Sequence, residues 1–298
     1  MKFTQLAVAV LAACAALSAG AQTITDGTSN TIQQSLTRSG VNVSGNINAK
    51  GTLNGNVTQA GGGAFSIFNG GQTLSPTGAA LPGGQQVRVG GVAGDVAARN
   101  ITANGTATAN ITQARVGALD GGNEQLVAIG SVANSTANDV NVRGNVVGLI
   151  SQIGASAASG VNTQALEVGS IDDTTANNVN ATGTLGAAVT QSSANGLAAF
   201  NEQVVAVGGA RRVQANNLTL NGSVIGAVTQ SEINLDAGGI SQVVNVGGAN
   251  NVVAKDINAS GTVRGFVSQV SANVASVGNE QSVVVGGVQG ARVSGPTR

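Results

Sequence analysis

Residues 218–230 read Leu-Thr-Leu-Asn-Gly-Ser-Val-Ile-Gly-Ala-Val-Thr-Gln. Counted back from Gln230, every second residue is apolar or glycine, as at Val228 and Val224, whereas polar residues such as Ser223 lie between them. Alternation with a period of two is typical of a half-buried β-strand, because a helix would need apolar residues three and four apart. The stretch therefore predicts a strand, and its glycines predict a bend or bulge within it.

The same pattern recurs along the chain as two motifs in one register. Copies of Gly-x3-(Gly/Ala)-x-(Val/Ile)-(Ser/Thr)-Gln end at Gln59, Gln113, Gln152, Gln191, Gln230 and Gln269, and they are evenly spaced from the second copy onward. Copies of Gln-x3-(Val/Ile)-Gly-(Gly/Ser) begin at Gln85, Gln125, Gln164, Gln203, Gln242 and Gln281. The second glutamine follows the first at a constant distance, except in the first repeat, where Gln59 and Gln85 lie more than twice as far apart. Together the motifs define a structural unit of about 39 residues.

A single unit of this kind cannot bury its apolar side alone, but units stacked along an axis bury a continuous column. The residue two before each first-motif glutamine is β-branched in all copies: Val57, Ile111, Ile150, Val189, Val228 and Val267. We therefore predict an all-β fold, a β-solenoid (β-helix) of six tandem repeats. Each repeat should hold three or four short strands. Asparagine pairs should supply the turns, as at Asn177–Asn178, Asn216–Asn217 and Asn250–Asn251.

The two glutamine columns have two interpretations. In the first, the amide side chains hydrogen-bond along the axis, as in cross-β stacks. In the second, each glutamine closes a turn of its own coil. The acidic residues Glu124, Glu202 and Glu280 occur in alternate repeats, which would keep like charges off neighbouring coils.

The N-terminus predicts export. Lys2 precedes an apolar stretch over residues 6–17, and Ala19-Gly20-Ala21 has the small-x-small pattern of a cleavage site, so residues 1–21 are predicted to be a signal peptide. The apolar stretch is shorter than the roughly 20 residues that a membrane span needs. Cys14 is the single cysteine, and residues 11–14 also resemble a lipobox, which would tether the protein to a membrane by a lipid. Either way we expect a bacterial protein that is secreted or held at the outer cell surface.

The remaining chain divides into three parts. We predict a lead-in segment over residues 22–45, the solenoid over 46–295 and a tail over 296–298. An insertion at residues 60–84 interrupts the first repeat and contains Phe65 and Phe68. Exposed aromatic residues on a loop are typical of a binding site, whereas a segment at the end of a solenoid can instead cap its open edge.

The residue inventory predicts no enzyme. The chain has no histidine, and Cys14 lies in the predicted signal, so a Ser/His triad, a Cys/His pair and a common zinc site are excluded in the mature chain. Asp172–Asp173 is the only paired carboxylate, and we interpret it as a solvated turn. Arg211–Arg212 is an isolated basic pair of the same kind, so no nucleic-acid surface is expected. We predict no catalytic, cofactor or metal site.

Residues 46–295 resemble the secreted functional-amyloid subunits of the curli and Fap types. The chain shares with these subunits a predicted signal peptide, tandem repeats rich in Gly, Asn, Gln, Ala and Val, paired internal glutamines and few charges, which make up 9% of its residues. The motif at residues 201–209 differs from the curli repeat, and the cysteine pair of Fap is missing. The resemblance implies self-assembly, coil end to coil end, into fibres of a biofilm matrix. The alternative is a cell-adhesion protein that binds a surface ligand, such as a matrix polysaccharide, through residues 60–84.

Overall fold

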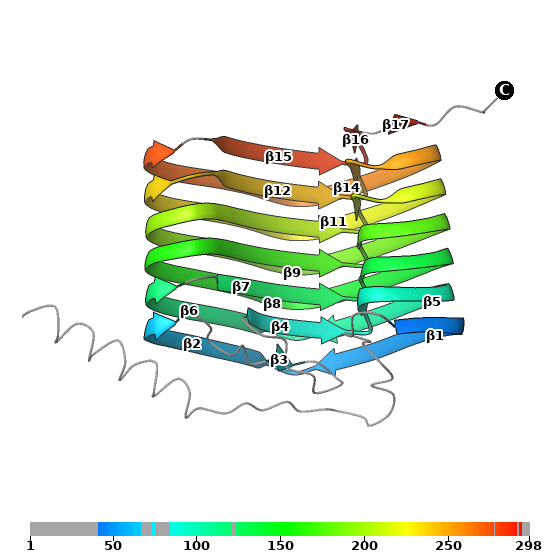
Figure 1. Cartoon of the computed structure of the whole chain (residues 1–298), viewed down its shortest axis with the longest axis horizontal. Helices are drawn as coiled ribbons and strands as arrows, with labels where there is room; N and C mark the ends of the chain where they lie inside the picture. Colours follow the sequence, from blue (N-terminus) through cyan, green and yellow to red (C-terminus); the bar gives the residue numbers. More distant parts are fainter. Residues whose placement is uncertain are drawn as a thin grey trace, which may run out of the picture.

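The computed structural model describes residues 41–66, 73–74, 84–120, 123–276, 278–290 and 292–293. Within these ranges the chain forms strands and turns and no helix, and the strands wind as a stack of parallel coils (Figure 1). The all-β solenoid predicted from the repeats is confirmed. The predicted signal peptide with Cys14, the tail at 296–298 and Phe68 lie outside the described residues.

Seventeen strands join in one sheet. In chain order they are β1 (Val41–Asn54), β2 (Val57–Ser66), β3 (Thr73–Leu74), β4 (Gly84–Val89), β5 (Val92–Thr108), β6 (Ile111–Asp120), β7 (Asn123–Ile129), β8 (Val132–Val168), β9 (Ile171–Val207), β10 (Ala210–Arg211), β11 (Gln214–Ala237), β12 (Ile240–Val246), β13 (Ala249–Asn250), β14 (Val253–Ser276), β15 (Asn279–Val285), β16 (Val288–Gln289) and β17 (Arg292–Val293). All of their pairings are parallel, as a coil wound in one direction requires.

One repeat forms one coil. Gln152 in β8 pairs with Gln191 in β9, which pairs with Gln230 in β11, so the register advances by one full repeat per coil. At the first step Val57 pairs with Ile111, a longer distance along the chain, because the insertion lengthens the first coil. Equivalent residues therefore lie on top of one another, as the sequence period predicted.

The strands are longer than the three or four short ones expected in each repeat. β8 and β9 each run for 37 residues, almost a whole coil. In a parallel stack every residue pairs with its equivalent in the coils above and below, so the backbone ladder continues around the corners. The expectation was wrong because a bend in the chain does not end pairing when the neighbouring coil bends at the same place.

Glycines allow the backbones of opposite walls of a coil to approach each other closely. Gly169 adopts a left-handed backbone with φ of 57°, and a Cβ built on it would lie 1.9 Å from the carbonyl oxygen of Thr182. A Cβ on Gly144 would lie 2.2 Å from the backbone nitrogen of Gly169. Only glycine fits where two backbones approach this closely. The glycines of the two motifs are therefore facing partners that pinch the coil.

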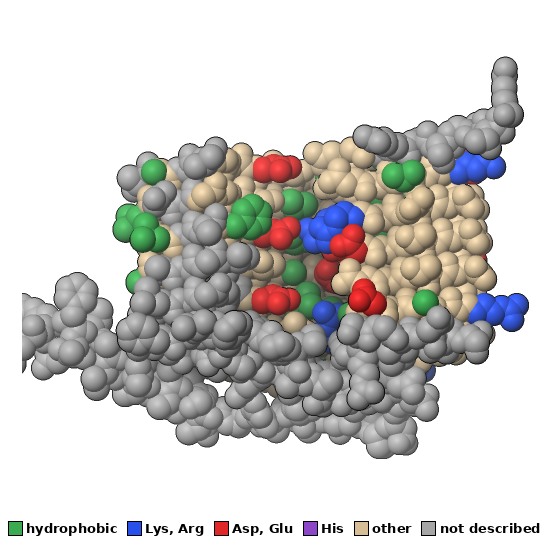
Figure 2. All heavy atoms as spheres, in the orientation of Figure 1, with side chains coloured by type: hydrophobic (Ala, Val, Ile, Leu, Met, Phe, Trp, Pro, Cys, Tyr) green, Lys and Arg blue, Asp and Glu red, His purple; other side chains and the backbone are tan. Residues whose placement is uncertain are grey.

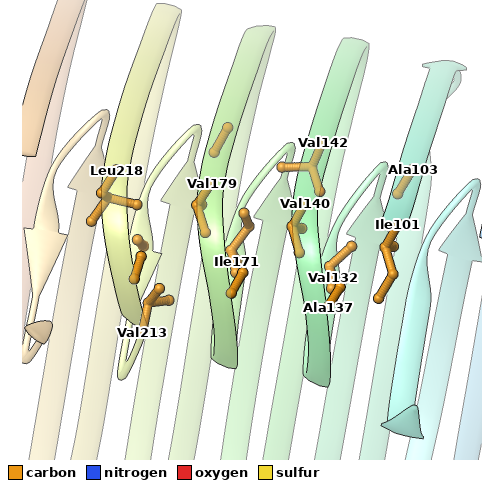
Figure 3. Packing of buried hydrophobic residues seen from close by; sticks show 14 of the residues in the cluster. Ile101, Ala103, Val132, Ala137, Val140, Val142, Ile171, Val179, Val213 and Leu218 are labelled. Carbon is orange, nitrogen blue, oxygen red and sulfur yellow. The ribbon is translucent and has the colours of Figure 1, made fainter. Parts of the chain in front are cut away.

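The pinch divides the apolar interior into two columns. One contains Ile101, Val140, Val179 and Leu218, which lie one above another in successive coils (Figure 3). The other contains the β-branched residues that precede the first-motif glutamines, among them Ile150. Full burial of a Val, Leu or Ile side chain contributes about 1.5–3 kcal/mol. Aliphatic columns can therefore replace the aromatic core that this chain lacks.

The turn prediction is wrong for two of the three asparagine pairs. Among the residues that the structure describes, the non-glycine residues with left-handed backbone are Asn134, Asp173, Arg212 and Asn251, which occupy the same position in four successive repeats. Asn177–Asn178 and Asn216–Asn217 instead lie within β9 and β11. Asn217 Nδ2 donates to Asn178 Oδ1 at 2.7 Å, so stacking satisfies the amides that a turn would otherwise use.

Candidate functional site

The first-motif glutamines form an axial ladder inside the solenoid. The Nε2 of Gln113 donates to Gln59 Oε1 at 2.7 Å, and the four later steps to Gln269 measure 2.8 Å each. Gln113, Gln152 and Gln191 lie within strands and are fully buried. This geometry is that of an axial ladder and not of turn closure. We call the column the first glutamine ladder.

The second-motif glutamines form a matching second glutamine ladder on the opposite wall. Its five steps run from Gln125 Nε2 to Gln85 Oε1 at 2.9 Å up to Gln281 Nε2 to Gln242 Oε1 at 2.7 Å. Both ladders also donate hydrogen bonds to backbone carbonyl oxygens of the opposite wall. Gln191 Nε2 shares its hydrogens with the carbonyl oxygens of Gln164 at 3.1 Å and Val204 at 3.0 Å. The amides thus tie the two walls together while their own polar groups stay satisfied.

Both ladders have a direction. Every Nε2 donates to the glutamine of the preceding coil, toward the N-terminal end of the stack. At the C-terminal end, Gln269 and Gln281 donate in the same way, but no described residue donates to the Oε1 of either. The C-terminal end of each ladder is therefore an acceptor.

The last full coil, formed by β14 and β15, has an open strand edge (Figure 1). β16 and β17 begin another coil, yet they pair only with Ala249–Asn250 and Val253–Ala254. Within the described chain, β15 pairs with β12 alone. Val283 and Val285 in β15 are 49% and 42% exposed, although their equivalents one coil below are fully buried. An unpaired edge that shows apolar interior side chains is a template for another strand.

The N-terminal end differs, because the insertion supplies a short strand there. Thr73 and Leu74 of β3 pair with Gln86 and Val87 of β4, on the side opposite β7. This pairing is what a cap would provide. β2 reaches into the insertion as far as Ser66, with the Phe65 backbone paired to Leu119, while the Phe65 side chain lies outside the described part of the structure. The structure therefore does not test the predicted binding contact through Phe65 and Phe68.

The acidic column behaves as its spacing suggested. Glu124, Glu202 and Glu280 stack with Thr163 and Ser241 between them, so no two of these carboxylates occupy neighbouring coils. Figure 2 shows acidic and basic side chains gathered near the middle of this face of the stack.

Across the same face, the structure joins charged pairs that the sequence placed in separate solvated turns. Arg211 stacks directly above Asp172 and contacts it at 3.0 Å, and its other terminal nitrogen contacts Glu202 at 2.9 Å. Arg212 contacts Asp172 and, at 3.0 Å, Asp173. The interpretation as isolated solvated turns was wrong. The missed signal was that Asp172 and Arg211 lie one full repeat apart, which puts opposite charges in one column.

This network is partly shielded from water. Burial by itself lowers the pKa of Arg211. The charge of Asp172, the hydrogen bond to Asp172 and the charges of Glu202 and Glu167 outweigh burial, so the pKa of Arg211 lies above its ordinary value. Burial, followed by the charge of Asp172, raises the pKa of Glu167, and nearby arginines oppose the rise. Since the charges satisfy one another, the network serves to lock neighbouring coils together.

Two further kinds of site are absent from the part of the chain that the structure describes. It contains no group of three or more Asp, Glu, His or Cys residues placed to hold a metal ion. It also contains no helix of the length and apolar character needed to cross a membrane.

Comparison with protein-family models, curated proteins and solved structures found no match to this chain.

Proposed function

We propose that this chain is a secreted structural subunit that assembles end to end into an extracellular or cell-surface fibre, of the functional-amyloid kind that supports a biofilm matrix. The observation that carries the proposal is the open edge of β14 and β15, which shows unpaired strand groups and the acceptor ends of both glutamine ladders. The predicted signal peptide, the absence of histidine and the self-stacking repeats support a structural role outside the cell.

A second copy would extend the solenoid by the same contacts that hold it together. Each internal coil boundary pairs parallel strands in register and covers interior valines, as β12 does for β9. At the open edge, a docking coil would cover Val283 and Val285 and continue both ladders. Once β3 has left the edge of β4, each new boundary would repeat the contacts of the internal ones, so one surface can add subunits repeatedly.

The direction of the ladders sets the orientation of docking. Because Gln269 and Gln281 present acceptors, the incoming coil must present donors, and donors face the N-terminal side of every coil. Copies therefore join head to tail. Such an interface is heterologous and does not close, so it generates a filament.

The test compares two valine substitutions on the purified chain from residue 22 onward. Wild type should form fibres visible by electron microscopy, with a meridional X-ray reflection at about 4.8 Å. Val283→Lys should stop fibre growth, because a charge would have to be buried at the new boundary. Val147→Lys is the matched control, since Val147 is 46% exposed on an outer side of β8 and should leave assembly unchanged.

Two results would contradict the proposal. Fibres that grow equally well from Val283→Lys would place the contact elsewhere. A wild-type chain that stays monomeric, yet binds matrix polysaccharide only when residues 60–84 are present, would favour the adhesin.

A further inference from the structure

The outer face of the wall that holds the first glutamine ladder is apolar. Leu149 and Ile153 in β8 point outward, since side chains alternate along a strand and Gln152 between them is buried inside. Phe266 and Val270 in β14 lie in the same two columns, three repeats further along the chain. These four apolar side chains are 42–60% exposed. A contiguous exposed apolar surface on a monomer is typical of an interaction site.

Between these two rows lies a strip of short side chains. Leu149 lies beside Ala188 of β9, and Phe266 lies beside Ala227 of β11. The other members of the strip are Thr190, Ser192, Thr229 and Ser231. Ser231 Oγ donates to Ser192 Oγ at 3.2 Å, so these two hydroxyls keep a partner when the strip is covered. We call Leu149 with Ile153, and Phe266 with Val270, the two ridges, and the ridges with the strip the outer apolar patch.

The outer apolar patch contains no charged residue. The ion pairs that the structure shows join Arg211 and Arg212 to Asp172, Asp173 and Glu202, none of which lies in these columns. A charged polymer would therefore find no ion pair on the patch. The core of a protein interface is poor in charge, so the patch fits an uncharged apolar surface.

The size of the patch indicates which apolar surface can cover it. From the spacing of strands and of side chains along them, its three columns over four coils span about 400 Å². A standard interface takes about 800 Å² from each partner, so the patch of one chain is too small for a stable pair. In a fibre the patch recurs once in every subunit. A partner that repeats with the same spacing can use all copies together, and the gain in avidity then makes a weak contact strong.

We propose that the outer apolar patch joins two fibres of this chain side by side, with a second copy as the occupant of each patch. The inference rests on the fibre proposed above, because only a second fibre has the same repeat. The ridges lie three coils apart, about 14 Å, which leaves room between them for one ridge of the partner. Since both copies carry the same patch, a ridge of each can lie in the strip of the other, as in an isologous contact.

The test measures, by electron microscopy, what fraction of filament length is paired in fibres of the purified chain from residue 22 onward. Wild-type filaments should lie in pairs or bundles. Leu149→Lys should reduce the paired fraction about 10-fold, because every subunit would bury a charge in the contact. Its growth rate by light scattering should stay unchanged, since Leu149 lies in β8 and not at the open edge. Asn141→Lys is the matched control, because it adds the same charge at an exposed position of β8 outside the patch and should keep both properties.

Ala188→Leu tests whether the strip must stay shallow. The substitution adds apolar surface but fills the space for the partner's ridge, so the paired fraction should fall about 3–10-fold. Pairing that rises in Ala188→Leu, or that persists in Leu149→Lys, would contradict the proposed contact.

Two results separate this inference from the proposed function. A wild-type chain that forms no fibres overturns both. Wild-type fibres that stay single overturn the side-by-side contact alone. If such single fibres sediment with phosphatidylcholine vesicles and Leu149→Lys fibres do not, the patch binds a lipid surface instead of a second copy.

Discussion

Among single residues, the buried glutamines stabilise the solenoid because each of their amides bonds to several buried partners. Gln191 accepts from Gln230, donates to Gln152 and binds two carbonyl oxygens of the opposite wall. Gln191→Leu would keep the volume roughly but leave these partners buried and unsatisfied. Since each such group costs about 1–3 kcal/mol, we expect a loss of about 2–5 kcal/mol in the free energy of unfolding.

Urea unfolding of the monomer, followed by circular dichroism, measures this loss. Gln214→Leu is the control, because Gln214 is exposed at the start of β11 and its substitution should change stability by no more than about 0.5 kcal/mol. Equal effects of the two substitutions would show that the ladder contributes little.

The sequence predicted which residues stack in one column. It did not predict which columns contact each other across the coil. A repeat of fixed length fixes the column, so the stacking of Gln152 on Gln191 needed no structure. The contact between Arg211 and Glu202 joins different columns, and it depends on how the corner turns at Arg212, whose φ is 51°. The period of the repeat predicts which residues stack along the axis, but it does not predict the contacts between side chains of different columns.

At the scale of elements, the short strand β3 controls access to the N-terminal end of the stack. Within the described residues, β1 pairs with β5 and β2 with β6, so their other edges remain unpaired, whereas β3 holds the edge of β4. Deleting residues 68–81 removes β3 and gives Gln59 and Gln85 the same spacing as the glutamine pairs of the other repeats. We expect the lag before fibre formation to shorten, because the edge of β4 becomes free to pair.

Time-resolved light scattering at fixed protein concentration checks this expectation. Replacing residues 68–81 by a Gly/Ser segment of equal length separates the loss of β3 from the change in spacing, and it should shorten the lag as well. A lag that lengthens in both variants would mean that the insertion promotes docking.

At the scale of the whole molecule, the two ends are not equivalent, so a fibre must have two different tips. One tip exposes the edge of β14 and β15, and the other exposes the N-terminal coil. Val283→Lys damages the first surface and leaves the second intact. This variant can therefore dock onto the β14 and β15 tip of a wild-type fibre, but it cannot receive the next subunit.

Two-colour imaging of seeded growth tests this polarity. Labelled wild-type seeds extended with wild-type chain should lengthen at both tips, whereas a small fraction of Val283→Lys in the growth mixture should stop one tip and spare the other. Val147→Lys at the same fraction should stop neither. Loss of growth at both tips would require a symmetric contact, which the single direction of the glutamine ladders forbids. Because every glutamine Nε2 points the same way along the stack, such a fibre should have one blocked tip and one growing tip.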